Sequence, residues 1–222
     1  MSSLETHHFS YPFPSIDSDS SGKAVLGWKD GMQPFHSDLE MDTNPGLNMI
    51  RWSAGAITAD ECRRIIEIGN SRPQVSGELE VHRDKYRDSH VAWIEPHPDT
   101  HWLYHKIGAL FNEVNAQCGF ELLGLIEPLQ YATYGASQHF DWHIDLGSGG
   151  ACVRKLSMTV QLTDESEYQG GDLEFLEGIE PGPRRSLGTV TIFPSFLAHR
   201  VTAVTSGIRR SLVAWACGPS FR

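Results

Sequence analysis

The chain has 222 residues, a formal net charge of −10 and 40% hydrophobic residues. This length suffices for one domain with a sizeable core, and no apolar run approaches the roughly 20 residues that a membrane span needs. The acidic balance argues against nucleic acid as the main partner, because a nucleic-acid-binding protein presents a basic stripe to phosphates.

The first 45 residues are rich in Ser, Asp, Pro and Gly and show no sustained helix or strand period. We expect residues 1–45 to form an N-terminal extension that is partly disordered or lid-like, and residues 46–222 to form the functional domain. Residues 1–14 lack the basic and apolar regions of a secretory signal, which predicts a cytoplasmic protein. Without CxxC spacing, the cysteines are expected to be reduced thiols: Cys62, Cys118, Cys152 and Cys217.

Two helices are predicted before the β-rich part of the chain. Thr58 and Glu61 form a capping-box pattern, and apolar residues follow them at helical spacing. A second helix is expected over residues 99–117, where apolar residues form one stripe. His101 and His105 flank that stripe one turn apart, but no third ligand lies nearby, so we do not expect a metal site there.

From residue 122 onward the pattern is that of short strands. Polar and apolar residues alternate over residues 156–162, which predicts a half-buried strand. Further runs at residues 172–175, 189–193 and 210–215 are separated by Gly and Pro. Helices followed by such strands predict a β sandwich or barrel backed by the N-terminal helices.

The segment His139-Phe-Asp-Trp-His-Ile-Asp145 carries the densest chemical signal. On a regular strand its two histidines and two aspartates share one face, because side chains two apart point the same way. A His-x-Asp pair places an imidazole nitrogen beside a carboxylate oxygen, as two adjacent metal ligands require. Two overlapping pairs are available, His139 with Asp141 and His143 with Asp145, and the residues alone leave both open.

His199 is the best candidate for a third metal ligand, because it follows the predicted buried strand at residues 189–193. Two histidines and one carboxylate leave open positions on an octahedral ion, an arrangement typical of non-haem Fe(II) oxygenases. Arg209 lies ten residues later, and its planar guanidinium can hold a carboxylate by two hydrogen bonds. We expect the strands of His199 and Arg209 to be neighbours, so that a metal-bound dicarboxylate meets the guanidinium at its far end.

Five sequence features follow one another along the second half of the chain: a His-x-Asp pair, KLSMTVQL at residues 155–162, YQGGDLEF at residues 168–175, His199, and GIR at residues 207–209. In this order they resemble the prolyl 4-hydroxylase-like branch of the 2-oxoglutarate/Fe(II) oxygenases. The likeness covers about residues 122–215. It implies an α+β, mainly β fold, a double-stranded β-helix (jelly-roll) barrel backed by N-terminal helices.

The resemblance also favours one of the two His-x-Asp pairs. In the family the liganding pair closes its strand just before a loop, and Asp145 is followed at once by the sequence LGSGG. The implied Fe(II) ligands are therefore His143, Asp145 and His199. His139 and Asp141 are then expected to face the same cavity beside the metal.

Implied contacts of the co-substrate 2-oxoglutarate are Arg209 and the hydroxyl of Tyr131. Tyr131 and Tyr134 lie upstream of the His-x-Asp pairs and are expected to share their strand. Asp172, in the Gly-Gly-Asp turn, is expected to be a structural turn residue.

The implied activity is hydroxylation of a C–H bond of an amino acid, peptide or small metabolite. Fe(II), 2-oxoglutarate and dioxygen take part, with ascorbate as an optional reductant and succinate and CO2 as co-products. Arg83, Arg87 and Arg154 are expected near the barrel mouth, where they suit a carboxylate-bearing substrate. The alternatives are a cupin-like metal enzyme without 2-oxoglutarate, which needs no carboxylate clamp at Arg209, and a non-catalytic ligand-binding barrel, which would form no succinate.

Overall fold

The computed structural model describes residues 50–77, 79–81, 84–176 and 185–220, together with the backbone of residues 15–18 and 24–27. The chain divides into two units, residues 1–43 and residues 44–222. In the first unit, strands β1 (Ser15–Ser18) and β2 (Ala24–Gly27) pair antiparallel. All the elements described below belong to the second unit.

The second unit is built on a seven-stranded sheet whose neighbouring strands are all antiparallel. Three of its central strands contain the run predicted at residues 210–215 and all but one residue of the runs predicted at residues 156–162 and 189–193. In sheet order the strands are β3 (Arg51–Ser53), β13 (Val190–Pro194), β10 (Arg154–Gln161), β16 (Arg209–Cys217), β8 (Leu129–Tyr134), β7 (His90–Ile94) and β4 (Val75–Ser76).

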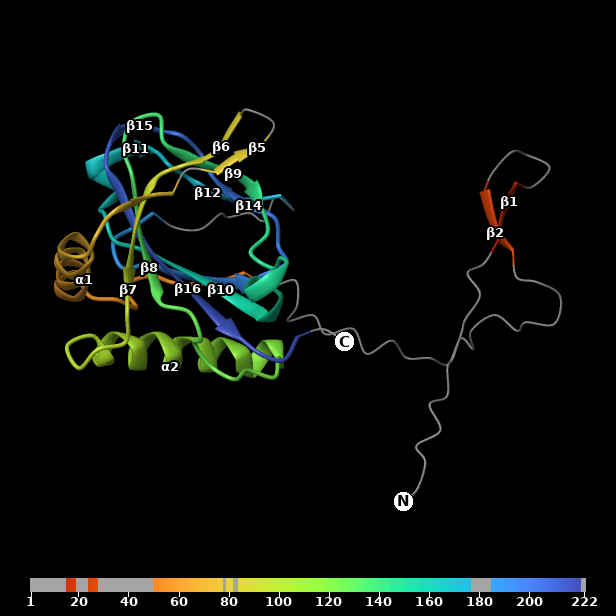
Figure 1. Ribbon diagram of the computed structural model, residues 1–222, viewed down its shortest axis with the longest axis horizontal. Coiled ribbons are helices and arrows are strands. Elements are labelled where there is room, and N and C mark those ends of the chain that lie inside the picture. The colour runs from red at the N-terminus through yellow and green to blue at the C-terminus, as the bar shows by residue number, and fades with distance from the viewer. Residues whose placement is uncertain are drawn as a thin grey trace, which may run out of the picture. The chain divides into compact units, whose positions relative to one another are not determined.

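A smaller antiparallel sheet of five strands lies opposite the large one (Figure 1). Strand β11 (Tyr168–Gly170) pairs separately with β15 (Val204–Gly207). Two facing antiparallel sheets of this kind form a jelly roll, so the predicted mainly β class is confirmed. In sheet order the strands of the smaller sheet are β12 (Leu173–Phe175), β14 (His199–Val201), β9 (His139–His143), β6 (Asp84–Asp88) and β5 (Leu79–Val81).

Both predicted α-helices are present. Helix α1 (Ala59–Ser71) begins after Thr58, where both hydrogen bonds of the capping box with Glu61 are formed. Helix α2 (His101–Cys118) ends at Gly119, whose φ of 70° gives the left-handed cap that favours glycine. Short 3-10 helices span Gly149–Val153 (η2) and Glu165–Glu167 (η3). Within the described residues, no helix has the length and apolar character to cross a membrane.

The main hydrophobic core lies between the two helices and the outer face of the large sheet. Figure 1 shows α2 running along that side of the sheet, and its residues Leu103, Ile107 and Phe111 are 0–1% exposed. Strand β10 was predicted to be half-buried, but Ser157 and Gln161 on its polar face are buried as well. The reason is that its polar face lies toward the smaller sheet rather than toward solvent.

The chain crosses from the large sheet to the small one between β8 and β9. A turn at residues 135–138 joins them, with the backbone N–H of Gly135 donating to Gln138 Oε1 at 2.7 Å. Ser137 adopts a φ of 67° in this turn. The expectation that Tyr131 and Tyr134 share a strand with His139 is therefore wrong.

Candidate active site

Three potential metal ligands meet between the two sheets. His143 ends β9, Asp145 follows two residues later, and His199 begins the paired strand β14 opposite His143. Asp145 Oδ1 is 3.9 Å from His143 Nε2, and Asp145 Oδ2 is 3.7 Å from His199 Nε2. Among the described residues this is the one group of three or more His, Cys, Asp or Glu side chains whose ligand atoms lie within 4.8 Å of one another.

Backbone carbonyls fix the orientation of both imidazoles. His143 Nδ1 donates to the carbonyl of Asp141 at 2.7 Å, and His199 Nδ1 donates to the carbonyl of Leu197 at 3.0 Å. A ring nitrogen that carries the donated proton leaves the other nitrogen with a free lone pair. Both Nε2 lone pairs are therefore available to a metal, in the arrangement common for ligating histidines.

The protonation states of the group also suit a metal. Burial, followed by the charge of the neighbouring His199, lowers the pKa of His143 to about 4. Burial alone would raise the pKa of Asp145, but His199, Ser157 and His143 together hold that pKa below its usual value. At neutral pH the site therefore offers a neutral His143 and an ionised carboxylate, as metal ligation requires.

A β-bulge in β9 decides which His-x-Asp pair faces the cavity. His199 pairs with His143 and Val201 pairs with Phe140. Three residue-to-residue steps along β9 are therefore matched by only two steps along β14. The extra residue reverses the alternation along the strand. Phe140 therefore faces the same side as His143, and their rings stack with centroids 3.5 Å apart.

The bulge corrects the expectation that all four polar residues of the segment share one face. His139 and Asp141 lie on the other side of the sheet, in a shallow hollow with Arg200. They are not among the residues that line the cavity of His143. The structure thus brings together the pair favoured by the resemblance and separates the alternative pair from it.

Arg209 lies buried in the same cavity without a carboxylate partner. It is 2% exposed, and its Nη1 donates to Ser211 Oγ at 3.3 Å. Its Nε atom has no hydrogen-bond partner, and no described carboxylate lies within 4.0 Å of its guanidinium. A buried cation without a counter-ion costs folding free energy, so this site favours binding of an anion.

The strands of His199 and Arg209 are not neighbours, contrary to expectation. His199 is on β14 of the five-stranded sheet, whereas Arg209 is on β16 of the seven-stranded sheet. Both residues line the space between the sheets. A ligand that spans the two therefore bridges the sheets rather than lying along one of them.

Tyr131 is not brought to this cavity. Its ring is fully buried in the core on the helix side of β8, and its hydroxyl donates to Asn70 Oδ1 at 3.0 Å. The predicted contact of Tyr131 with 2-oxoglutarate is therefore wrong. Tyr134, on the opposite face of β8, lines the cavity with Arg209, whose guanidinium carbon is 5.5 Å from the Tyr134 ring centroid.

The cavity has a volume of about 320 Å³ and is lined by apolar side chains together with many polar and charged ones. Such a volume is that of a small-molecule site. Its apolar walls come from both sheets and include Phe140, Met158, Leu173, Phe193, Val201 and Val213.

Two of the three arginines expected at the barrel mouth line this cavity, namely Arg87 and Arg154; Arg83 lies outside the described residues. Arg154 is neutralised by Glu127, to which its Nε donates at 2.7 Å. Its Nη1 also donates to the carbonyl of Asp145 at 3.3 Å. Glu127 was not predicted as a site residue, because nothing in the sequence indicates its pairing with an arginine 27 positions away.

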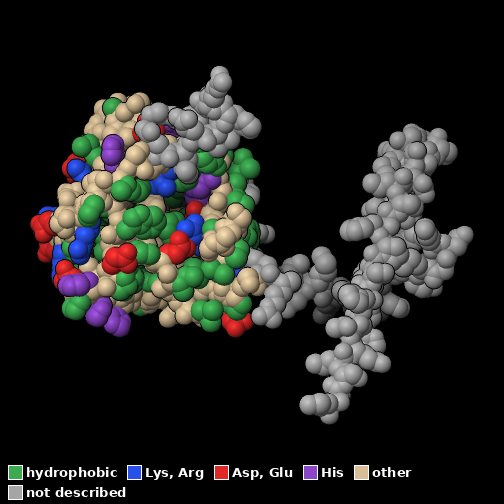
Figure 2. Space-filling model, viewed as in Figure 1, with side chains coloured by type: hydrophobic (Ala, Val, Ile, Leu, Met, Phe, Trp, Pro, Cys, Tyr) green, Lys and Arg blue, Asp and Glu red, His purple; other side chains and the backbone are tan. Residues whose placement is uncertain are grey.

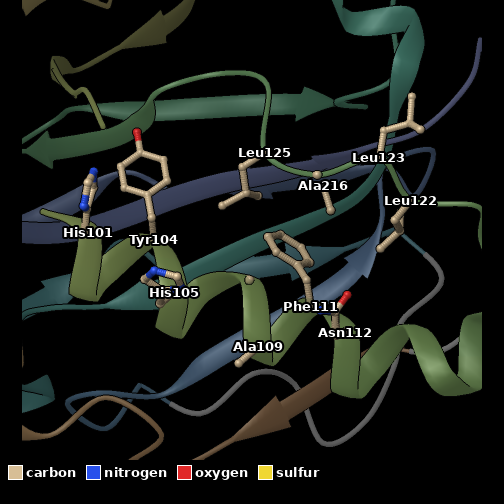
Figure 3. A pocket seen from close by; sticks show the side chains of 12 residues that line it. His101, Tyr104, His105, Ala109, Phe111, Asn112, Leu122, Leu123, Leu125 and Ala216 are labelled. Carbon is tan, nitrogen blue, oxygen red and sulfur yellow. The ribbon is translucent and has the colours of Figure 1, made fainter. Parts of the chain in front are cut away.

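A second, larger hollow of about 650 Å³ lies between α2 and residues 122–125 (Figure 3). His101 and His105 stand at one end of it, with Leu122, Leu123 and Leu125 among its other lining residues. No acidic or cysteine side chain lines this hollow. Among the described residues, His101 and His105 belong to no group of three or more potential metal ligands, and the expected absence of a metal site there stays a prediction.

Charges are mixed over the face of the molecule in Figure 2. Acidic and basic side chains are interspersed among hydrophobic and other side chains there. The expected absence of a nucleic-acid partner stays a prediction.

Comparison with known proteins places these features in context. Residues 129–217 match the profile described as "2OG-Fe(II) oxygenase superfamily". A PKHD-type hydroxylase of Synechococcus sp. strain CC9311 is 42% identical over 77 residues, which cover 34% of this chain and 35% of that protein. One of strain CC9605 is 35% identical over 98 residues, with 43% and 44% covered. The matched region thus spans less than half the length of these relatives.

Solved structures show a similar fold. A Pseudomonas putida prolyl-4-hydroxylase matches with a TM-score of 0.58 and 20% identity, over 78% of this chain and 94% of that chain. A Trichoplax adhaerens prolyl hydroxylase, in complex with a hypoxia inducible factor peptide fragment, matches with a TM-score of 0.62 and 17% identity, over 77% and 84%. At these identities the likeness is one of fold.

Proposed function

We propose that the protein is a 2-oxoglutarate-dependent Fe(II) hydroxylase of the prolyl 4-hydroxylase-like branch of the 2OG-Fe(II) oxygenase superfamily, whose profile residues 129–217 match. One observation carries the proposal. The cavity that holds the His143, Asp145 and His199 cluster also holds the buried, unpaired guanidinium of Arg209. A metal-binding dicarboxylate matches both features at once.

The donor set fits Fe(II). Two neutral imidazole nitrogens and one carboxylate oxygen form the facial triad that leaves three positions open on an octahedral ion. We assign His143, Asp145 and His199 as the ligands, because their donor atoms converge and both Nδ1 atoms are already bonded to backbone carbonyls. Open positions are what a catalytic metal site needs in order to bind co-substrate and dioxygen.

Arg209 fits the distal carboxylate of 2-oxoglutarate. Its guanidinium is buried on the sheet opposite His199, so a dicarboxylate held at the metal reaches it across the cavity. A charge-assisted pair here would relieve the unpaired buried cation. Tyr134, which lines the same part of the cavity, replaces Tyr131 as the tyrosine proposed to contact the co-substrate.

Bound Fe(II), 2-oxoglutarate and dioxygen would supply the oxidising power to hydroxylate a C–H bond, with succinate and CO2 released. The chain's own part is positional. Arg154 holds the backbone carbonyl of Asp145, and Phe140 holds the ring of His143 by stacking. The apolar walls exclude bulk water from the reacting centre.

We propose an amino acid, a peptide or a small metabolite as the substrate class. The similar proteins include a PKHD-type hydroxylase and a prolyl hydroxylase in complex with a peptide fragment. Ascorbate as a reductant and a cytoplasmic location stay predictions.

The proposal is tested by measuring succinate formed from 2-oxoglutarate by the purified protein, with and without Fe(II), in the absence of added substrate. We expect slow, Fe(II)-dependent succinate release in the wild type and its loss in His199→Ala. The matched control is His105→Ala, an exposed histidine of α2, which is expected to keep the wild-type rate. An absence of succinate with Fe(II) bound would favour the cupin-like enzyme or the non-catalytic ligand-binding barrel.

A further inference from the structure

We propose that Arg87 binds a carboxylate of the substrate, so that the enzyme acts on an anionic substrate rather than a neutral one. The inference rests on the proposed function and concerns the same cavity. It narrows the substrate class to molecules with a carboxylate close to the carbon that is oxidised.

Arg87 stands beside the metal ligands. It lies on β6 and lines the cavity of His143, Asp145 and His199. Its guanidinium carbon is 4.6 Å from the centroid of the Phe140 ring, and that ring stacks on His143. Only the ring of Phe140 therefore lies between the guanidinium of Arg87 and the proposed metal ligand His143.

Among the described residues, no carboxylate balances the charge of Arg87. Its Nε donates to Ser89 Oγ at 2.9 Å and its Nη2 donates to Gln130 Oε1 at 2.8 Å, and both acceptors are neutral. Within the described part of the chain, no carboxylate lies within 4.0 Å of this guanidinium. Ser89 and Gln130 orient the group while its Nη1 edge remains available to a ligand.

Three other arginines of the two sheets and their loops are paired with carboxylates, whereas Arg209, which also has no carboxylate partner, is assigned to the co-substrate. Arg154 pairs with Glu127, Arg185 pairs with Asp172, and Arg200 pairs with Glu174. Their charges are thus neutralised inside the protein. The role of Asp172 as a structural turn residue stays a prediction.

With the co-substrate bound, Arg87 is the cavity cation left without a counter-charge. The two positive charges of Fe(II) offset the two negative charges of 2-oxoglutarate, and the charge of Arg209 offsets that of Asp145. Closing the cavity with a neutral substrate would strip water from Arg87 without replacing it, which is unfavourable. A substrate carboxylate removes this penalty and gains a charge-assisted hydrogen bond.

The same carboxylate chemistry has two sources, the α-carboxylate of a free amino acid and the side chain of an acidic residue in a peptide. The probes are therefore matched pairs. One arm compares free L-amino acids, including L-proline, with their C-terminal amides. The other arm compares short amidated peptides that contain Asp or Glu with the same peptides containing Asn or Gln.

Two readouts are taken on the wild-type enzyme loaded with Fe(II) and 2-oxoglutarate. The first is stimulation of succinate release by each probe. The second is anaerobic calorimetric binding of each probe, which needs no turnover. Succinate release without any probe reports on the proposed function itself, so a failure of that function is seen separately.

We expect at least one carboxylate probe to bind about tenfold or more tightly than its amide partner, as a charged hydrogen bond predicts. In Arg87→Gln this preference ratio is expected to fall close to one, and in Arg87→Lys it is expected to be intermediate. Because the ratio is taken within one protein, a general loss of activity cancels. Arg63→Gln, a change at an exposed arginine of α1, is the control expected to keep the wild-type ratio.

Three outcomes would overturn the proposal. One is equal binding of carboxylate and amide probes by the wild type. Another is a preference that survives in Arg87→Gln. The third is an absence of binding by any carboxylate probe to an enzyme that releases succinate.

Discussion

The ring of His143 lies flat against the ring of Phe140, with 3.5 Å between the centroids and 11° between the planes. The two residues are three apart on one strand, and only the bulge in β9 turns both toward the cavity. Tyr86 meets the Phe140 ring edge-on, with ring centroids 5.8 Å apart. His143, a proposed metal ligand, is thus held by a backbone hydrogen bond at Nδ1 and by an aromatic face.

Replacing Phe140 by Leu is expected to weaken Fe(II) binding about tenfold, because the stack that orients His143 is lost while the ligand set stays intact. The measurement is an anaerobic competition titration of Fe(II) against a chelator. Trp142→Leu is the control on the same strand, since Trp142 does not line the cavity and packs under Arg200 instead. Equal Fe(II) affinity in Phe140→Leu and wild type would contradict the proposed support.

Replacing Gly171 by Ala is expected to displace Arg209. A Cβ atom at Gly171 would stand 2.9 Å from Arg209 Cδ, and the φ of Gly171 is +65°. We predict a clear rise in the 2-oxoglutarate concentration needed for half-saturation, together with a loss of roughly 1 kcal/mol in unfolding free energy.

Gly55→Ala is the matched control for that change. Gly55 has a similar φ of +68°, but its Cβ would meet nothing within 4 Å. It is expected to lose comparable stability and to keep the wild-type requirement for 2-oxoglutarate. If both variants bind 2-oxoglutarate as the wild type does, the contact between Gly171 and Arg209 is not important for the site.

The two tyrosines of β8 are expected to give opposite results. Tyr131→Phe removes the hydrogen bond to Asn70 in the core and should lower the unfolding free energy by about 1 kcal/mol, with no change in 2-oxoglutarate binding. Tyr134→Phe should weaken 2-oxoglutarate binding instead. Chemical denaturation and a 2-oxoglutarate titration on both variants make the comparison, and the reverse pattern would restore Tyr131 to the site.

Cys62 is expected to be unreactive in the native protein. Burial, followed by the charge of Glu61, raises its pKa to about 11, so on the order of one thiol in a thousand is ionised at pH 8. The half-buried Cys152 should therefore react first with iodoacetamide. Mass spectrometry before and after unfolding in urea measures this order, and early labelling of Cys62 would show that α1 opens readily.

The parts of the fold that were predicted correctly depend on local chemistry. The capping box of Thr58 and Glu61 lies within four residues, and it marks the start of α1 correctly. The cluster of His143, Asp145 and His199, which we propose to be the metal ligands, was also indicated by the sequence, because the residue types and the loop after Asp145 are local features.

The parts that were predicted wrongly depend on partners far away in the chain. The bulge in β9 depends on its pairing with β14, about 60 residues later in the chain. The sequence of β9 alone predicted a regular strand, in which side chains alternate between the two faces. Tyr131 lies in the core and Tyr134 lies at the cavity because the helices cover the face of β8 that carries Tyr131. The sequence of β8 does not indicate which of its faces the helices cover. The ion pair of Arg154 with Glu127 could not be predicted either, because the two residues are far apart in the chain.

The most direct test of the proposed site is an anaerobic titration of the metal-free protein with Fe(II) and 2-oxoglutarate, followed by visible absorption. We predict a weak metal-to-ligand charge-transfer band in the wild type. The band should be absent in His199→Ala and should require far more 2-oxoglutarate in Arg209→Ala. No band in the wild type at saturating Fe(II) and 2-oxoglutarate would contradict the assignment of this cavity as a 2-oxoglutarate-binding iron centre.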